Sequence, residues 1–299
     1  MENKTKGYKG ISPSSLKPTK KVSAVILDWD ATLATSLEAT LKALQETFKL
    51  MDEIGYPVNI PWLENGKTFD DVTVEELVQH KHVRSRLFLK ELYTDYYKAS
   101  DPEKGEKAAK FAKEIFDMAR EPIRENAILL DGAFESLKEL LDRVKHVTIV
   151  SDKDKATLET QVKLLLGDKF KIGFEENFNS SIHDILVVGG VKGRKEKPHG
   201  DKFLDALDKM RVRPNDGKIW VVGDRIIDIG AAIDISNKYD VKPILFSSRY
   251  VGIIKKEEKV IAGDKEVGIK PEDIGMVMDH EEFQKMIKTE LPQQKNLAR

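Results

Sequence analysis

Apolar positions along this 299-residue chain follow two different spacings. In some short runs nearly every residue is apolar, which is typical of strands buried on both faces of a parallel sheet. Between these runs, apolar residues recur every three or four positions, as on one face of a helix. From residue 127 onward the two patterns alternate, which predicts an α/β fold with a doubly wound parallel sheet. The first strand is expected to end at Leu27, and later strands are expected at residues 146–151, 185–188, 219–222, 244–246 and 276–278.

The segment between the first strand and residue 127 shows only the helical spacing. Within it, Thr73 and Glu76 have the spacing of a capping box, and Asp101 followed by Pro102 is typical of a helix start. We therefore expect a group of helices at residues 36–126. These helices would be inserted into an α/β core formed by residues 22–35 and 127–290.

The remaining segments carry weaker patterns. Residues 1–21 are rich in lysine and contain glycine and proline, so we expect a flexible tail there, and a second short tail at residues 291–299. Residues 247–275 are charged and contain several glycines, and their pattern predicts no particular element.

Composition narrows the class of protein without naming a substrate. The 50 Lys and Arg residues balance 51 Asp and Glu residues, so no overall field favours nucleic acid or an anionic membrane. No apolar run approaches the roughly 18 residues that span a bilayer. The N-terminal stretch lacks the apolar core of a signal peptide, and we expect a cytoplasmic protein without a membrane partner. The chain has no cysteine, which excludes disulfides, thiolate catalysis and cysteine-ligated zinc.

Two acids, Asp28 and Asp30, follow directly after the first strand. In a parallel sheet the carboxyl ends of the strands face the ligand crevice, so this spacing delivers both acids to the usual place of chemistry. Residues at i and i+2 of an extended chain share a face, and the Thr32 hydroxyl is expected to hydrogen-bond within the following loop. The alternative interpretation is a strand followed by an ordinary acidic turn.

Three further polar motifs follow in order along the chain. Ser151 ends one expected strand, and Gly223 and Asp224 end another. Lys197 precedes a proline between these two strands, and Asp228 lies four residues after Asp224. Asp228 also stands where an acid would favour the first turn of a helix, and both roles are compatible.

These side chains fit phosphoryl transfer. A carboxylate can attack phosphorus to form an aspartyl-phosphate, and Mg²⁺ suits a site made of oxygen ligands. A lysine and a hydroxyl can hold phosphoryl oxygens, and a second carboxylate can protonate the leaving oxygen and later deprotonate water.

The four motifs together resemble those of the haloacid dehalogenase-like hydrolases, over residues 22–35 and 127–246. The resemblance implies a Rossmann-like core with a helical cap over the active site. It implies that Asp28 is the nucleophile, that Asp30 is the acid/base, and that Ser151 and Lys197 bind phosphate. It further implies that Mg²⁺ is held by the side chains of Asp28, Asp224 and Asp228 and by Asp30, which offers a backbone carbonyl. Of three nearby lysines, Lys197 is chosen because a proline follows it, unlike Lys192 and Lys195.

Two residues depart from the commonest form of these motifs. Ala31 stands where glycine is usual, which is tolerated unless the backbone there needs a positive φ. Arg225 stands where a small hydroxyl residue is usual, and we expect it to pair with a surface acid rather than to point toward phosphate. The presence of Asp30 favours phosphate esters, because dehalogenases and phosphonate-cleaving relatives generally lack this acid.

The histidines and a basic cluster do not support further sites. His80 and His82 lie at i and i+2 of a helical stretch and so do not share a face, and we expect exposed side chains rather than metal ligands. The nearby basic residues are expected to form a solvated helix face. They are Lys81, Arg84, Arg86 and Lys90. We assign no role to His146 or His199.

The sequence therefore predicts a Mg²⁺-dependent phosphatase that acts on a small phosphorylated metabolite. The main alternative is a phosphotransferase or phosphomutase that passes the same aspartyl-phosphate to a sugar hydroxyl. A non-catalytic binding protein on this fold is the third interpretation, disfavoured because every motif acid is intact.

Overall fold

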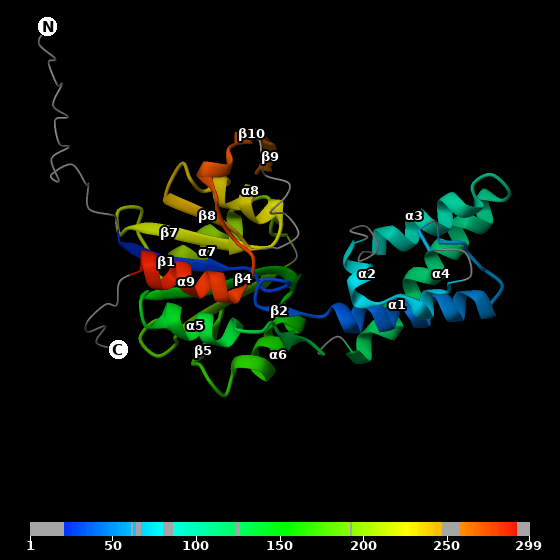
Figure 1. Cartoon of the computed structure of the whole chain (residues 1–299), viewed down its shortest axis with the longest axis horizontal. Coiled ribbons are helices and arrows are strands. Elements are labelled where there is room, and N and C mark those ends of the chain that lie inside the picture. The colour runs from blue at the N-terminus through cyan, green and yellow to red at the C-terminus, as the bar shows by residue number, and fades with distance from the viewer. Residues whose placement is uncertain are drawn as a thin grey trace, which may run out of the picture.

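Figure 1 shows two groups of elements in this computed structural model, a layered α/β core and a set of helices that extends from it. The structure describes residues 21–60, 62–63, 67–79, 86–123, 126–191, 193–246 and 258–291. The predictions for nearly all of both tails, for His80 and His82, and for Lys81 and Arg84 lie outside these residues. Among the described residues, no helix has the length and the apolar character needed to cross a membrane.

Seven parallel strands form the sheet of the core, in the order β11-β8-β7-β1-β4-β6-β5. Strand β1 lies between β7 and β4, so the strands that carry three of the four motifs are neighbours. Their carboxyl ends therefore meet at one edge, as the sequence predicts. The strand bounds are β1 Val22–Leu27, β4 His146–Asp154, β5 Ile172–Phe174, β6 Ile185–Gly190, β7 Lys218–Gly223, β8 Asp240–Phe246 and β11 Gly275–Val277.

Helices cover both faces of this sheet because side chains alternate along each strand. In β1, Val25 and Leu27 belong to one buried cluster, whereas Ala24 and Ile26 belong to another. The first cluster includes apolar residues of α5 (Ala133–Leu141), α6 (Lys155–Leu166) and α9 (His280–Glu290). The second includes residues of α7 (Asp201–Lys209) and α8 (Ile226–Asp234). The doubly wound α/β architecture predicted from the sequence is confirmed.

Helices α1–α4 lie to one side of the core and have a hydrophobic cluster of their own (Figure 1). A short antiparallel pair, β2 (Ala34–Thr35) with β3 (Ile128–Leu129), joins the two chain segments that connect them to the core. Asp101 caps α4 as expected, since its carboxylate accepts a hydrogen bond from the Lys104 N–H at 3.0 Å. The bounds are α1 Leu37–Glu53, α2 Val74–Gln79, α3 Arg86–Tyr97 and α4 Pro102–Arg120, with 3₁₀ turns at Phe69–Asp71 and Glu121–Ile123. Residues 36–126 as a separate domain remain a prediction.

Several elements differ from the sequence expectation. Strand β4 continues to Asp154, three residues beyond the expected end at Ser151. Strand β5 was not expected, because three residues are too few to show a periodicity. The described part of residues 247–275 contains the antiparallel pair β9 (Glu258–Ala262) and β10 (Lys265–Ile269) and a 3₁₀ turn at Pro271–Asp273.

Candidate active site

Asp28 is held rigidly at the carboxyl end of the central strand. Its backbone N–H donates to the Val222 carbonyl at 2.8 Å, which fixes the residue against β7. The side chain is 3% exposed. Its Oδ2 atom accepts no hydrogen bond from a described residue, an unusual condition for a buried carboxylate oxygen.

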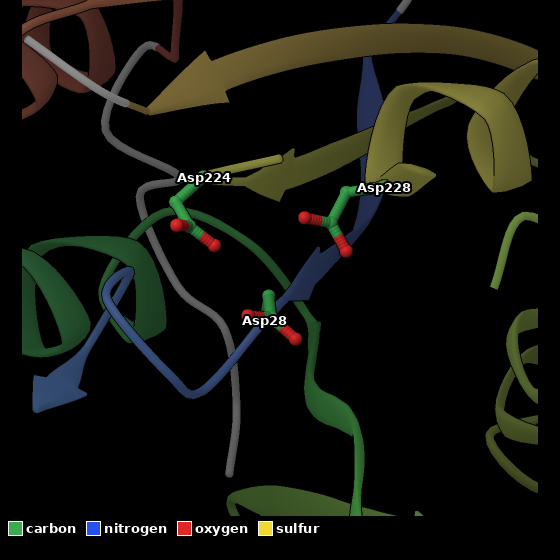
Figure 2. A group of neighbouring side chains, drawn as sticks. All are labelled: Asp28, Asp224 and Asp228. Carbon is green, nitrogen blue, oxygen red and sulfur yellow. The ribbon is translucent and has the colours of Figure 1, made fainter. Parts of the chain in front are cut away.

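Asp224 and Asp228 approach Asp28 from the adjoining strand and helix, as Figure 2 shows. One oxygen from each of the three carboxylates lies within 4.8 Å of the others. Gly223 makes this approach possible, because a Cβ atom at that position would lie 2.4 Å from the Cβ of Asp228. The second carboxylate oxygen of Asp228 accepts the Arg225 N–H at 3.0 Å. Asp228 therefore sits both in the acid cluster and in the first turn of α8, as the sequence allowed.

Lys197 is the cation of this cluster. Its Nζ atom lies 2.5 Å from Asp28 Oδ1 and 2.7 Å from Asp228 Oδ1, and it donates to the Val150 carbonyl at 3.1 Å. Lys195 instead pairs with the exposed Asp264 at 3.4 Å, and Lys192 lies outside the described residues. The lysine selected from the sequence is thus the one that contacts the acids.

The three buried carboxylates exceed the charge that one lysine can neutralise. Burial raises the pKa of Asp28 to about 7; Lys197 opposes this rise, and the charges of Asp228 and Asp30 add to it. Burial raises the pKa of Asp224 to about 8, and the charges of Asp28 and Asp228 contribute. Burial acts to lower the pKa of Lys197, but the charges of Asp228 and Asp28 outweigh it and raise that pKa.

These residues fit a divalent cation. Asp28 Oδ2 and Asp224 Oδ1 are buried oxygens that accept no hydrogen bond from a described residue. Together with Asp228 they form a compact set of oxygen ligands, the type that Mg²⁺ prefers. A bound cation would also relieve the repulsion that raises the two carboxyl pKa values.

The structure does not bring Asp30 into this carboxylate set. Its side chain is 44% exposed and pairs with Lys153, whose Nζ lies 2.7 Å from Asp30 Oδ1. Ser151 is buried, and its hydroxyl accepts a hydrogen bond from the backbone N–H of Lys153 at 3.2 Å. Lys153 was missed in the sequence, where it lies in a charged stretch that is typical of an exposed loop.

The loop after Asp28 corrects one expectation. The Thr32 hydroxyl is buried and makes no hydrogen bond with a described residue, whereas it was expected to bind within the loop. The loop is tied instead by its backbone, because the Thr32 carbonyl lies 2.9 Å from Nε2 of the buried His280.

Arg225 also differs from the expectation of a surface partner. Its Nε atom lies 3.9 Å from Asp224 Oδ1, so the nearest acid belongs to the cluster itself. Burial acts to lower the pKa of Arg225, but the charges of Asp228, Asp28 and Asp224 outweigh it and raise that pKa. Arg225 therefore adds a partly exposed positive charge beside the acid cluster.

Ala31 adopts a φ of 59°, the left-handed conformation that favours glycine. Its N–H donates to the Ala34 carbonyl at 2.7 Å, which holds the loop in this shape. The backbone at this position therefore does need a positive φ, and we expect the alanine to be strained there where glycine would not be.

Ala31→Gly should therefore raise the free energy of unfolding by about 0.5–1 kcal/mol, because relief of left-handed strain exceeds the added entropy of the unfolded chain. Ala39→Gly, within helix α1, is the matched control and should lower it by about 1 kcal/mol. Denaturant unfolding of both variants measures the two changes. Equal losses in both variants would show that position 31 carries no strain.

A cavity of about 350 Å³ lies beside Asp224. Ala31, Thr35 and Leu37 line it from the chain segment that follows β1, and Leu130 and His280 line it from other parts of the core. A space of this size holds a small organic molecule.

A parallel sheet with buried acids at the carboxyl ends of its central strands, and with helices inserted after β1, defines a Rossmann-like α/β protein with a candidate active site at that edge of the sheet. The family model for haloacid dehalogenase-like hydrolases matches residues 22–235, and the chain belongs to that family.

Solved structures share this fold at low sequence identity. A hydrolase of subfamily IA, variant 1, from Geobacter sulfurreducens PCA is 18% identical, with a TM-score of 0.52 over 89% of this chain and 96% of that one. A candidate phosphoglycolate phosphatase from Lactobacillus delbrueckii subsp. bulgaricus is 16% identical, with a TM-score of 0.55 over 89% and 98%. A candidate β-phosphoglucomutase from Thermotoga maritima is 15% identical, with a TM-score of 0.51 over 90% and 99%. No curated protein matches the chain.

Proposed function

We propose that this hydrolase is a Mg²⁺-dependent phosphatase that cleaves a small phosphate monoester through an aspartyl-phosphate on Asp28. The observation that carries the proposal is the buried contact of Asp28 with Lys197, beside Asp224 and Asp228. A nucleophilic carboxylate needs a fixed position and cationic groups that offset the charge of an incoming phosphate. Asp28 has both.

The first half-reaction forms a bond between an Asp28 oxygen and phosphorus while the bond from phosphorus to the leaving oxygen breaks. Asp30 donates its proton to that oxygen, so that an alcohol departs. In the second half-reaction Asp30 takes a proton from water, whose oxygen bonds to phosphorus. The bond to Asp28 then breaks, which releases phosphate and restores both carboxyl groups.

Two further residues hold the phosphoryl group in this proposal. The Lys197 ammonium stays charged because two carboxylates surround it, and it is in place to offset charge on the transferred oxygens. Ser151 lies on β4, beside the strand that carries Asp28, and its buried hydroxyl can donate to a phosphoryl oxygen.

Mg²⁺ would be held by the carboxylates of Asp28, Asp224 and Asp228, with the backbone carbonyl of Asp30 as a further ligand. When bound, the cation supplies positive charge that offsets the phosphate dianion. Asp28 Oδ2 and Asp224 Oδ1, which accept no hydrogen bond from a described residue, support this assignment.

The cavity beside Asp224 supports a small substrate. The helices α1–α4, with a hydrophobic cluster of their own, support a cap. We propose that residues 36–126 form a lid whose closure excludes water and selects the alcohol part of the substrate. A folded variant with this segment replaced by a short linker should lose selectivity among phosphate esters before it loses hydrolysis of an aryl phosphate. Full selectivity in that variant would contradict the cap proposal.

Measurement of phosphate release from a panel of phosphorylated metabolites with Mg²⁺ tests the proposed function. We expect release from at least one small monoester. If the phosphate leaves the substrate but is found on a sugar hydroxyl rather than as free phosphate, the protein is a phosphotransferase instead. No turnover with any ester would contradict the phosphatase proposal.

Asp30→Ala should slow turnover of an alkyl phosphate by roughly 10²–10⁴-fold, the usual contribution of a positioned acid/base. An aryl phosphate should lose less, because its leaving oxygen needs little protonation. Steady-state kinetics with the two esters measures the difference. Equal losses would show that leaving-group protonation is not the main role of Asp30.

A further inference from the structure

Lys153 is a buried cation that the proposed mechanism does not use. Its side chain is only 7% exposed, although it contacts Asp30, whose side chain is 44% exposed. The Lys153 Nζ atom lies 2.7 Å from Asp30 Oδ1 and donates to Gln161 Oε1 at 2.8 Å. The Lys153 ammonium therefore bridges the carboxylate of Asp30 and the amide oxygen of Gln161.

Gln161 anchors this lysine to the core. The glutamine is fully buried on α6, and its Oε1 atom also accepts the indole N–H of Trp29 at 2.9 Å. Trp29 is itself fully buried and lies between Asp28 and Asp30 in the chain. Contacts thus run from Trp29 to Gln161 on α6, from Gln161 to Lys153, and from Lys153 to Asp30.

The arrangement matches what an exposed acid/base needs. A half-exposed aspartate without a partner samples several rotamers, and fixing one of them costs side-chain entropy. An ammonium has three donors, so Lys153 can hold Gln161 and Asp30 at the same time.

We propose that Lys153 is a positioning residue that holds the Asp30 carboxylate in the orientation required for proton transfer, with Gln161 fixing the lysine. This inference rests on the proposed phosphatase function of Asp28 and Asp30. Lys153 acts through Asp30 and does not itself contact the reacting atoms.

Three variants of the full-length protein test the role. Lys153→Met removes the ammonium and keeps a side chain of similar length, Lys153→Arg keeps the charge, and Lys163→Met on α6 is the matched control, with a side chain 61% exposed. For an alkyl phosphate we expect Lys153→Met to lower kcat by roughly 10²-fold, the cost of a small misplacement of a reacting group, with KM nearly unchanged. Lys153→Arg and Lys163→Met should retain most of the activity.

Two comparisons separate positioning from a general structural effect. The loss in Lys153→Met should be smaller for an aryl phosphate, which depends little on Asp30. In an Asp30→Asn background, Lys153→Met should cause no further loss, because the group that it positions is already disabled. Thermal unfolding checks that each variant folds. If Lys153→Met does not fold, Gln161→Leu, which leaves the lysine but removes its anchor, should show the same substrate dependence.

The outcomes distinguish this inference from the proposed function. Two results in a protein whose wild type is active would overturn the positioning role alone. The first is that Lys153→Met loses the same fraction of activity with both esters. The second is that Lys153→Met causes a further loss of activity in the Asp30→Asn background. A wild type that releases no phosphate from any ester would overturn the proposed function and this inference with it.

Discussion

Asp28→Asn should reduce phosphate release on the order of 10⁶-fold, the scale seen when a covalent nucleophile is removed from a hydrolase. The physical reason is that an amide nitrogen does not attack phosphorus, while the substitution hardly changes the volume of the side chain. Steady-state rates for the pure variant measure the loss. Acid quenching of the wild type during turnover should in addition trap a phosphoryl group on Asp28.

The fold should survive this substitution. Asp28 is buried among other acids, and its pKa of about 7 shows that ionisation there is unfavourable. An uncharged residue at position 28 removes that cost above pH 7, and Lys197 keeps Asp228 as a partner. The metal-free variant should therefore be no less stable than the metal-free wild type at pH 8.

A second variant controls for loss of an exposed acid. Asp264 is 79% exposed and lies outside the acid cluster and the lining of the cavity, so Asp264→Asn should keep wild-type turnover. If pure Asp28→Asn protein retained activity within tenfold of the wild type, Asp28 would not be the nucleophile.

The parts of the site that depend on strand topology follow from the sequence. Asp28, Ser151 and Asp224 lie on or directly after strands, and parallel strands deliver such residues to one edge of a sheet. Lys197 lies in a loop, and only its following proline, through the family resemblance, separated it from Lys195. The catalytic, phosphate-binding and metal roles of these residues stay predictions.

The parts that depend on side-chain direction do not follow from the sequence. The pairing of Asp30 with Lys153 requires the geometry of the loop after β1, of the end of β4, and of Gln161, which lies eight residues beyond Lys153 on α6. The Thr32 hydroxyl was assigned a hydrogen bond from local chemistry, whereas the contact that ties the loop comes from His280, 248 residues away. Tertiary contacts of this kind leave no local pattern.

Removal of divalent cations should reduce phosphate release to background, and Mg²⁺ should restore it. Ca²⁺ should bind but support little turnover, because it is larger and accepts a looser coordination. Asp224→Asn should lose most of the response to Mg²⁺, whereas Asp264→Asn should keep it. Full turnover after rigorous chelation would contradict the proposed role of the metal.

Stability supplies a readout of the same site that does not depend on turnover. The folded-state pKa values of Asp28 and Asp224, about 7 and about 8, exceed the ordinary value of 3.8. Between pH 4 and 8 the folded protein therefore binds more protons than the unfolded chain, so the metal-free protein should lose stability as the pH rises through this window. Mg²⁺ favours the ionised carboxylates and displaces these protons, so its stabilising effect should grow with pH. At pH 8 a concentration 100 times the dissociation constant should add about 2.7 kcal/mol to the free energy of unfolding. Denaturant unfolding with and without Mg²⁺ at pH 5 and pH 8 measures this, and an equal gain at both values would show that the ion binds away from Asp28 and Asp224.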